Sequence, residues 1–361
     1  MDGVAIIGAG IAGLSCAVEL ERKGIRPVIF EQKHQVGSPF TFAPLLLNFM
    51  VPPMGDPAEK LKQEYQLALK TLAPLKSLMI KGPNAKYAIK GRLGHILLRG
   101  QGQQTIESQL SGMLKTPVRF QNYVKPEELL KDFNYLVVAD GTNRWAKKLH
   151  IWQSAFQGWV RGATILGKFN PFRAGVWVNT DYCKGGLAYL APMSSQKASL
   201  VLIVPNIQPA QLNSLWQKFL KEENIRGELV ELWDVDYETG LLHTHRVGNT
   251  FFTGNSGGFV SSWFGSGVFT SIISGIQAAR SIAGNADYEK NMGPYSHLLL
   301  RHTRFQKFWH RLDNRGIDRM LRLIFTPPLK QIFFHSNLNL LRVTDPLFQH
   351  LLKGTKDPIQ P

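Results

Sequence analysis

Six residues near the start of the chain have the spacing of a phosphate-binding turn. Residues 8–13 read Gly-Ala-Gly-Ile-Ala-Gly and match the pattern G-x-G-x-x-G. In such a turn Gly8 permits the tight bend, Gly10 lets a pyrophosphate approach the backbone, and Gly13 lets the following helix pack closely. Ile11 and Ala12 open that helix, whose N-terminal amides and partial positive charge attract phosphate. The pattern therefore predicts a dinucleotide-binding site.

The segments around this turn have the periodicities that its geometry requires. Residues 4–7 form a short apolar run typical of a buried parallel strand, and apolar residues follow at helical spacing up to Gly24. Residues 27–31 predict a second strand that ends at Glu31. A carboxylate there accepts hydrogen bonds from adenosine ribose hydroxyls. We therefore place Glu31, with Gln32 beside it, in the predicted site.

Two later segments predict further turns at strand ends. Residues 135–139, YLVVA, form a strongly apolar strand that stops at Asp140 and Gly141. Residues 250–253 predict another strand, followed by a glycine-rich loop over 254–267 and a helix through 282. Ligands of open α/β sheets collect at the carboxyl ends of strands, so both turns are expected beside the glycine pattern.

In order and spacing, these three segments resemble the flavoprotein group that contains p-hydroxybenzoate hydroxylase and the geranylgeranyl reductases. The resemblance covers most of residues 1–285 and is strongest for the geranylgeranyl reductase-like branch. It implies that the cofactor is FAD, which the glycine pattern alone does not distinguish from NAD. It also implies that the chain is an enzyme, an FAD-dependent oxidoreductase.

The resemblance further implies where later residues would meet FAD. The implied contacts are Arg99 against the flavin, Asp140 and Gly141 near the pyrophosphate, Gly254 and Asn255 at the ribityl chain, and Gly265, Ser266 and Gly267 at the pyrimidine edge of the ring. The group usually has an aspartate where this chain has Asn255. The amide can still hydrogen-bond a ribityl hydroxyl, although it carries no charge.

Redox chemistry on a hydrophobic substrate is the predicted function. Phe42, Tyr189 and Trp263 fall in segments expected to face the flavin, where aromatic walls suit an apolar pocket, although aromatic residues are equally common in cores. The resemblance implies that reduced FAD saturates an alkene in a hydrophobic small molecule or isoprenoid-like lipid. Two alternatives stay open: a flavin-dependent hydroxylase (monooxygenase) of an aromatic or polyketide substrate, and a non-catalytic binding protein that FAD stabilises.

No catalytic acid or base is identified from the residues. No second glycine pattern offers a resident nicotinamide domain, so the reductant, NAD(P)H or another electron donor, is expected to come from outside. The cofactor itself carries hydride and electrons, which makes the missing acid–base pair less damaging to the assignment.

The expected fold is a mixed α/β flavoprotein. It combines a Rossmann-type FAD-binding domain with an antiparallel-sheet substrate domain like that of p-hydroxybenzoate hydroxylase, and a helical C-terminal tail. The FAD-binding domain is expected over residues 1–45, 92–150 and 246–296, and the substrate domain over 46–91 and 151–245. Residues 297–361 are expected to form a basic helical region.

Other reactive side chains indicate no second chemistry. His243 and His245 could share one strand face, but no carboxylate or cysteine cluster accompanies them, so no metal site is predicted. Cys16 and Cys183 are too few for a disulfide framework. Cys183 lacks an evident base, which favours a buried structural thiol.

The chain is strongly basic, with a formal net charge of +16 and an isoelectric point of about 9.8. This charge favours anionic partners, but no nucleic-acid-binding motif accompanies it, so nucleic acid is not an expected partner. No export signal and no run of about 20 apolar residues is visible. We therefore expect a cytoplasmic protein.

The basic charge continues into residues 297–361, which hold 11 Lys or Arg and 4 Asp or Glu. Basic residues recur every three or four positions, which predicts a basic stripe on one face of a helix, with apolar residues at helical spacing beside it. The stripe is formed by Arg304, Lys307, Arg311, Arg315, Arg319 and Arg322. Either this helix lies as a peripheral contact on the acidic inner face of a membrane, or its apolar side packs on the protein's own body. Gly316 and the pair Pro327-Pro328 are expected to interrupt it.

Overall fold

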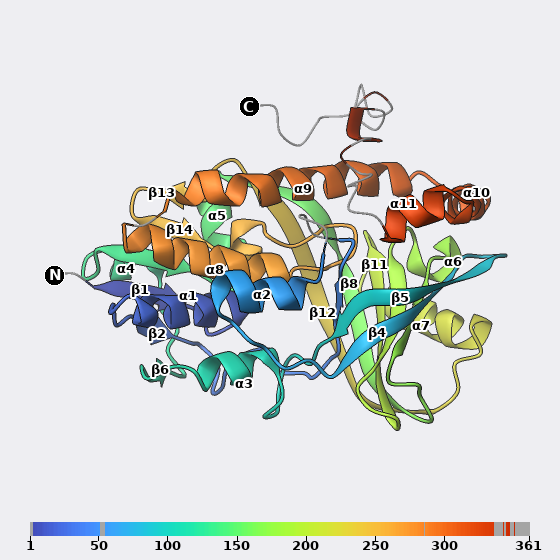
Figure 1. Cartoon of the computed structure of the whole chain (residues 1–361), viewed down its shortest axis with the longest axis horizontal. Helices are drawn as coiled ribbons and strands as arrows, with labels where there is room; N and C mark the ends of the chain where they lie inside the picture. The colour runs from blue at the N-terminus through green and yellow to red at the C-terminus, as the bar shows by residue number, and fades with distance from the viewer. Residues whose placement is uncertain are drawn as a thin grey trace.

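The chain folds around two β-sheets that a long C-terminal helix bridges. The computed structural model describes residues 3–50, 55–284 and 286–335, together with positions 342, 344–346 and 350. Figure 1 shows the smaller sheet among helices on one side of the molecule and the larger sheet on the other. The predicted fold class, a Rossmann-type half, a second sheet and a helical C-terminal region, is confirmed.

The smaller sheet has the strand order β13-β14-β7-β1-β2-β6. Its strands are β1 (Val4–Ile7), β2 (Val28–Phe30), β6 (Val118–Arg119), β7 (Tyr135–Val138), β13 (Arg246–Val247) and β14 (Thr250–Phe252). All neighbours pair in parallel except β13, which is antiparallel to β14. The apolar residues 4–7 and 136–138 are buried because helices cover both faces of the sheet.

Successive residues of β1 face different helical layers, because side chains alternate along a strand. Ile6 shares a core with α1 (Ile11–Arg22), α3 (Ile106–Ser111) and α8 (Val268–Ile282). Ala5 and Ile7 share another with α4 (Pro126–Leu129) and α5 (Arg144–Lys148). The glycine turn therefore leaves β1 at the carboxyl edge of the sheet, where β7 and β14 also end.

The larger sheet has the order β12-β8-β11-β10-β9-β4-β5-β3. Its strands are β3 (Leu45–Leu47), β4 (Ala73–Lys81), β5 (Lys86–Ile96), β8 (Trp152–Leu166), β9 (Arg173–Trp177), β10 (Leu187–Pro192), β11 (Lys197–Pro205) and β12 (Glu228–Leu242). Three helices accompany them: α2 (Pro57–Tyr65), α6 (Thr180–Cys183) and α7 (Gln211–Glu222).

This sheet is antiparallel, as predicted, apart from one pair. β4 and β9 run parallel, from Ser77 opposite Arg173 to Lys81 opposite Trp177. The pair joins the early segment of the sheet to the later one. Sequence periodicity could not show it, because an alternating pattern is the same for either strand direction.

Three helices follow the sheets: α9 (Tyr288–Trp309), α10 (Asn314–Phe325) and α11 (Leu329–His335). α9 bridges both halves, because Tyr288 and Met292 pack in the smaller-sheet core whereas Phe305 and Trp309 pack in the larger-sheet core. Within the described part of the chain, no helix has the length and apolar character needed to cross a membrane.

The prediction of one basic stripe on one helical face was wrong. α9 ends at Trp309 and α10 begins at Asn314, where Asp313 caps the new helix, so the six residues lie on two helices and the turn between them. Gly316 does not interrupt anything, since it lies in the first turn of α10. Arg304 is buried, with 9% exposure, and pairs with Asp345 at 2.9 Å.

Candidate functional site

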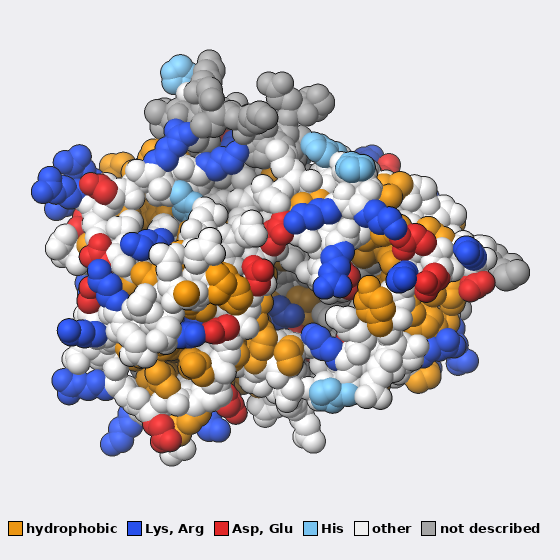
Figure 2. Space-filling view, turned by 180° about the vertical axis from the view of Figure 1, so that it is seen from behind, with side chains coloured by type: hydrophobic (Ala, Val, Ile, Leu, Met, Phe, Trp, Pro, Cys, Tyr) orange, Lys and Arg blue, Asp and Glu red, His pale blue; other side chains and the backbone are white. Residues whose placement is uncertain are grey.

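A cavity of about 830 Å³ lies between the two sheets. Figure 2 shows the molecule hollowed between its two halves, with hydrophobic and basic side chains at the border. Of the predicted site residues, these line the cavity: Gly8, Gly10, Ile11, Ala12, Glu31, Gln32, Phe42, Arg99, Asp140, Gly141, Tyr189, Gly254, Asn255, Trp263, Gly265, Ser266 and Gly267. Gly13 lies behind the wall, where α1 meets β1.

The glycine turn has a closed side and an open side. Gly8 has a φ of +102°, and a Cβ there would lie 2.5 Å from the carbonyl oxygen of Ala139. A Cβ at Gly13 would lie 2.0 Å from the carbonyl oxygen of Gly8. At Gly10, the N-cap of α1, a Cβ would meet nothing within 4 Å. This opening beside a helix N-terminus fits a pyrophosphate.

Glu31 stabilises the glycine turn through hydrogen bonds from backbone amides. One carboxylate oxygen accepts from the Ala9 amide at 2.8 Å and the other from the Lys33 amide at 2.9 Å. The residue is buried, with 6% exposure, yet it borders the cavity. Each carboxylate oxygen has a further lone pair, so the group can also accept from a ribose hydroxyl.

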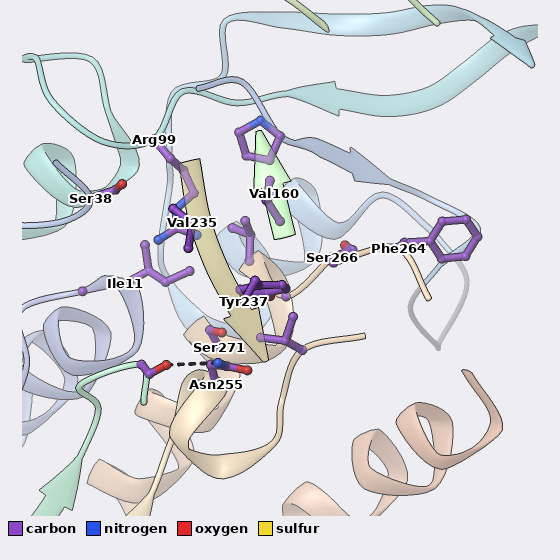
Figure 3. Close-up of a pocket in the computed structure, with 18 of the residues that line it drawn as sticks. Ile11, Ser38, Arg99, Val160, Val235, Tyr237, Asn255, Phe264, Ser266 and Ser271 are labelled. Atoms are coloured by element: carbon purple, nitrogen blue, oxygen red, sulfur yellow. Dashed lines mark hydrogen bonds between the residues drawn. The ribbon is translucent and has the colours of Figure 1, made fainter. Parts of the chain in front are cut away.

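Asp140 and Asn255 are held by bonds between the ends of β7 and β14. Ser256 Oγ donates to Asp140 Oδ1 at 2.7 Å and accepts from the Gly141 amide at 2.9 Å. Asn255 Nδ2 donates to the carbonyl oxygens of Gly141 and Glu238, both at 3.0 Å, and Figure 3 shows the first bond.

The Asn255 Oδ1 atom is buried and has no hydrogen-bond partner among the described residues. A hydroxyl of a bound ribityl chain would supply the missing donor. Asn255 thus fits FAD although the group usually carries an aspartate at this place.

The glycine-rich loop before α8 brings a second helix start to the cavity. Gly267 is the N-cap of α8, and the Gly265 amide donates to Ser261 at 2.9 Å. The first turns of α1 and α8 both border the cavity. The first backbone amides of a helix have no partner within the helix, and the helix N-terminus carries a partial positive charge. Both attract phosphate and carbonyl oxygens, which FAD has.

Arg99 projects toward the middle of the cavity from the chain that follows β5 (Figure 3). Its Nε donates to Glu107 Oε1 at 2.9 Å, and its guanidinium lies 5.5 Å from the centre of the Phe42 ring. Glu107 is fully buried, and its other carboxylate oxygen accepts from the Gly100 amide at 3.4 Å. Sequence reasoning missed Glu107, although a carboxylate in the first turn of α3, eight residues after Arg99, was a usable signal.

β12 supplies a wall that sequence reasoning also missed. Trp233, Val235 and Tyr237 line the cavity, and Val160 of β8 lies opposite Val235. Their spacing of two residues is the signal that could have found them, because alternate residues of a strand share one face.

The three predicted aromatic residues all line the cavity, and Tyr189 and Trp263 also pack against the larger-sheet core. Phe42 lies 6.0 Å from the Trp233 ring, which stacks on Phe40 at 4.0 Å. Trp263 packs on Phe305 at 4.1 Å within the larger-sheet core and still lines the cavity. The two interpretations of these side chains are therefore compatible.

The histidine and cysteine candidates lie elsewhere. His243 is exposed, whereas His245 is buried and its Nδ1 lies 2.9 Å from a Glu289 oxygen. Across the described ranges, no group of three or more His, Cys, Asp or Glu could hold a metal ion. Both cysteines are buried, and burial raises their thiol pKa, so neither is an activated nucleophile.

Comparison with known proteins gives a local sequence match. A family model described as "FAD binding domain" matches residues 3–79. The glutamate synthase (NADPH) small chain of Halomonas elongata is 54% identical over 39 residues, which are 11% of this chain and 8% of the relative. The match thus spans a small fraction of that relative.

Two solved structures share nearly the whole fold. A geranylgeranyl bacteriochlorophyll reductase-like protein from Thermoplasma acidophilum has a TM-score of 0.71 and 14% identity, covering 99% of both chains. A flavin-dependent brominase has a TM-score of 0.63 and 16% identity, covering 97% of this chain and 99% of that one.

The glycine turn lies within residues 3–79, which match the model of an FAD binding domain. The two solved structures share this fold with the chain, and their sequences are 14% and 16% identical to it.

Proposed function

We propose that this protein uses bound FAD to reduce a carbon–carbon double bond in a hydrophobic small molecule or isoprenoid-like lipid. The observation that carries the proposal is the change from polar to apolar lining along the cavity. The end at the smaller sheet offers glycine amides and the polar groups of Glu31, Asp140 and Asn255. The end at the larger sheet is aliphatic, with Leu78, Ile80, Val176, Val178, Leu187, Val201 and Ile203.

The apolar end is built to hold a neutral ligand away from water. Among the described lining residues, the strands of the larger sheet contribute no carboxylate and no histidine. Burial raises the pKa of Tyr189, and it raises the pKa of Tyr237 to about 12, so both phenols stay neutral. Such walls suit hydrocarbon, which gains roughly 25 cal/mol per Å² of surface removed from water.

Each end of the cavity then has its own task. Gly10, Glu31, Asn255 and the start of α8 would hold FAD, which when bound supplies hydride and electrons. The apolar walls would orient the alkene and exclude water. The electrons would come from an external donor, NAD(P)H or another reductant.

A second candidate is hydroxylation of an aromatic or polyketide substrate. It is favoured by the aromatic side chains where the two ends of the cavity meet, namely Phe40, Phe42, Trp233 and Tyr237. Such rings stack well on a flat substrate.

Anaerobic chemistry separates the candidates. The FAD-loaded protein is reduced with dithionite without oxygen and mixed with isoprenoid alkenes. Alkene reduction is expected to reoxidise the flavin and to yield a product with two added hydrogens. Reoxidation only in air, with oxygen added to an aromatic substrate, would establish the hydroxylase instead. A flavin that stays reduced with every substrate and transfers nothing in air would indicate a non-catalytic FAD-stabilised protein.

A further inference from the structure

α10 has one face that belongs to the fold. Ile317, Leu321 and Phe325 are buried in the larger-sheet core. Phe325 stacks on Tyr87 of β5, with ring centres 4.3 Å apart and planes at 10°. The apolar register of this helix therefore packs on the protein's own body, which was one of the two interpretations of the sequence.

The other face of α10 is cationic and exposed. Arg315, Arg319 and Arg322 are all exposed and fall within an arc of about 60°, because each residue of a helix advances by about 100°. Leu323 lies beside them and is 55% exposed. Figure 2 shows Lys and Arg side chains at the edge of the molecule where α10 lies, at the upper left of that view.

The acidic side chains near this face are engaged in holding the helix. Asp318 accepts from the backbone amide and the Nδ2 of Asn84, at 3.2 and 2.7 Å, and so ties α10 to the turn between β4 and β5. Asp313 accepts from the Gly316 amide at 2.7 Å and caps the helix. Neither carboxylate lies between the three arginines on the helical wheel. The exposed face formed by these arginines is therefore positively charged.

The same helix borders the cavity from its inner side. Leu321, Ile324 and Phe325 of α10 line the apolar end, as do Phe333 and Phe334 of α11. One helix thus separates a hydrocarbon-lined cavity from a cationic outer surface.

We propose that the outer face of α10 binds the surface of an anionic phospholipid bilayer. Arg315, Arg319 and Arg322 contact the headgroups, and Leu323 enters the interface between them. The exposed leucine favours a bilayer over nucleic acid or an acidic protein surface, since arginines alone would serve those partners. Docking by this face would bring the apolar end of the cavity close to the bilayer.

Vesicle sedimentation of the full-length protein tests this surface. Phosphatidylcholine vesicles with added phosphatidylglycerol should bind the protein, and vesicles of phosphatidylcholine alone should not. The triple variant R315Q/R319Q/R322Q should partition about tenfold or more weakly. Leu323→Ser should also weaken binding, although it changes no charge. Binding of the unchanged protein should fade as salt rises.

The matched control is K62Q/K131Q/K221Q, which removes three exposed positive charges at separate places on the surface. Equal losses in the control and the α10 variant, or equal binding to neutral vesicles, would overturn the proposal. So would retention on DNA by the same arginines without sedimentation on anionic vesicles. If thermal melting shows that the triple variant is unfolded, Arg319→Gln alone is compared with Lys131→Gln. No readout involves flavin turnover, so the outcome is independent of the proposed function.

Discussion

Gly8 and Gly13 face protein backbone, whereas Gly10 faces open space. A side chain at either of the first two would collide with a carbonyl oxygen at 2.5 Å or less, so the fold itself requires glycine there. Among the described residues, none comes within 4 Å of a Cβ placed at position 10. A ligand that occupies this space would explain why the position has no side chain.

Replacing Gly10 with leucine should therefore separate folding from cofactor binding. We expect Gly10→Leu to melt within a few degrees of the unchanged protein when both lack flavin, but to purify colourless, because the side chain fills the place of the pyrophosphate. Gly293→Leu is the control, since a Cβ at Gly293 also meets nothing within 4 Å. Absorbance of released FAD is the measurement. A yellow Gly10→Leu protein would contradict the assignment.

Glu31 should matter for both FAD and the shape of the turn. Glu31→Gln replaces one charged acceptor by a donor that faces the amide of Ala9 or Lys33. We expect a loss of about 1.5 to 3 kcal/mol, or about tenfold to over a hundredfold in FAD affinity. The control is Glu21→Gln, because Glu21 also accepts from two backbone amides, those of Lys115 and Thr116.

Both variants should melt earlier without flavin, but only Glu31→Gln should bind FAD more weakly in a fluorescence titration. Equal FAD affinities would mean that Glu31 is purely structural.

Residue types predicted the tight glycine turn because Gly8 and Gly13 each have a local steric reason to be there. Partners distant in sequence were harder to predict. Ser256 joins Asp140 across 116 positions, and Tyr237 reaches the cavity from a strand that only the folded sheet brings there. Such contacts depend on strand order, which single-residue patterns do not encode.

Among the elements, α9 is tied to the turn after β12 by one carboxylate. Glu289 accepts from the amides of His245 and Arg246 and from Thr244 Oγ1, at 2.6 to 2.8 Å. Burial raises its pKa, but the hydrogen bond from His245, the charge of that ring and the other bonds outweigh this and lower the pKa to about 2. The ionised form is therefore part of the fold.

The sign of the pH effect follows from this lowered pKa. Stability from Glu289 is fully present above its ordinary pKa of 4.5 and is lost as pH falls toward 2. Glu289→Gln should reduce the unfolding free energy at pH 7 by about 1 kcal/mol, a modest effect because 43% of the side chain is exposed. Its stability should then change less between pH 4.5 and 2. Urea unfolding at several pH values measures both effects.

Glu128→Gln is the control, since 66% of that side chain is exposed and its carboxylate lies 3.9 Å from the amino group of Lys125. An acid transition of Glu289→Gln that matches the unchanged protein would contradict the role of this carboxylate.

Elements with a strong period were predicted close to their observed places, as at β7 and α8. The C-terminal helices were not. Basic residues keep a spacing of three or four positions through the turn at 310–313. The spacing of charges alone therefore cannot show where one helix ends. The capping carboxylate Asp313 was the informative residue, because Asp is a favoured N-cap.

For the molecule as a whole, the cavity exists only because two sheets meet. The glycine turn comes from the first residues of the chain, whereas the apolar walls come from β4, β9, β10 and β11. α9 holds the halves together by packing in both cores. The sequence predicts two kinds of sheet. It does not predict that the two sheets face each other, because that arrangement depends on packing between segments far apart in the chain.

A bulky residue deep in the apolar end should block substrate without touching FAD. Val176 of β9 lies between Tyr189 of β10 and Ile80 of β4, and all three side chains line the cavity. In Val176→Trp the indole would extend into open space and not into packed core, so we expect little change in melting temperature. Binding of a long-chain fluorescent lipid should fall about tenfold or more, since the indole takes the volume that the hydrocarbon would fill.

FAD content, read from the visible absorbance, should stay the same. Val247→Trp, on the edge strand β13 where Val247 is 38% exposed, is the control and should change neither ligand. A loss of FAD in Val176→Trp would mean that the cofactor itself occupies the apolar end. Unchanged lipid binding would place the substrate elsewhere, because a ligand seated against β9 cannot share its volume with the new ring.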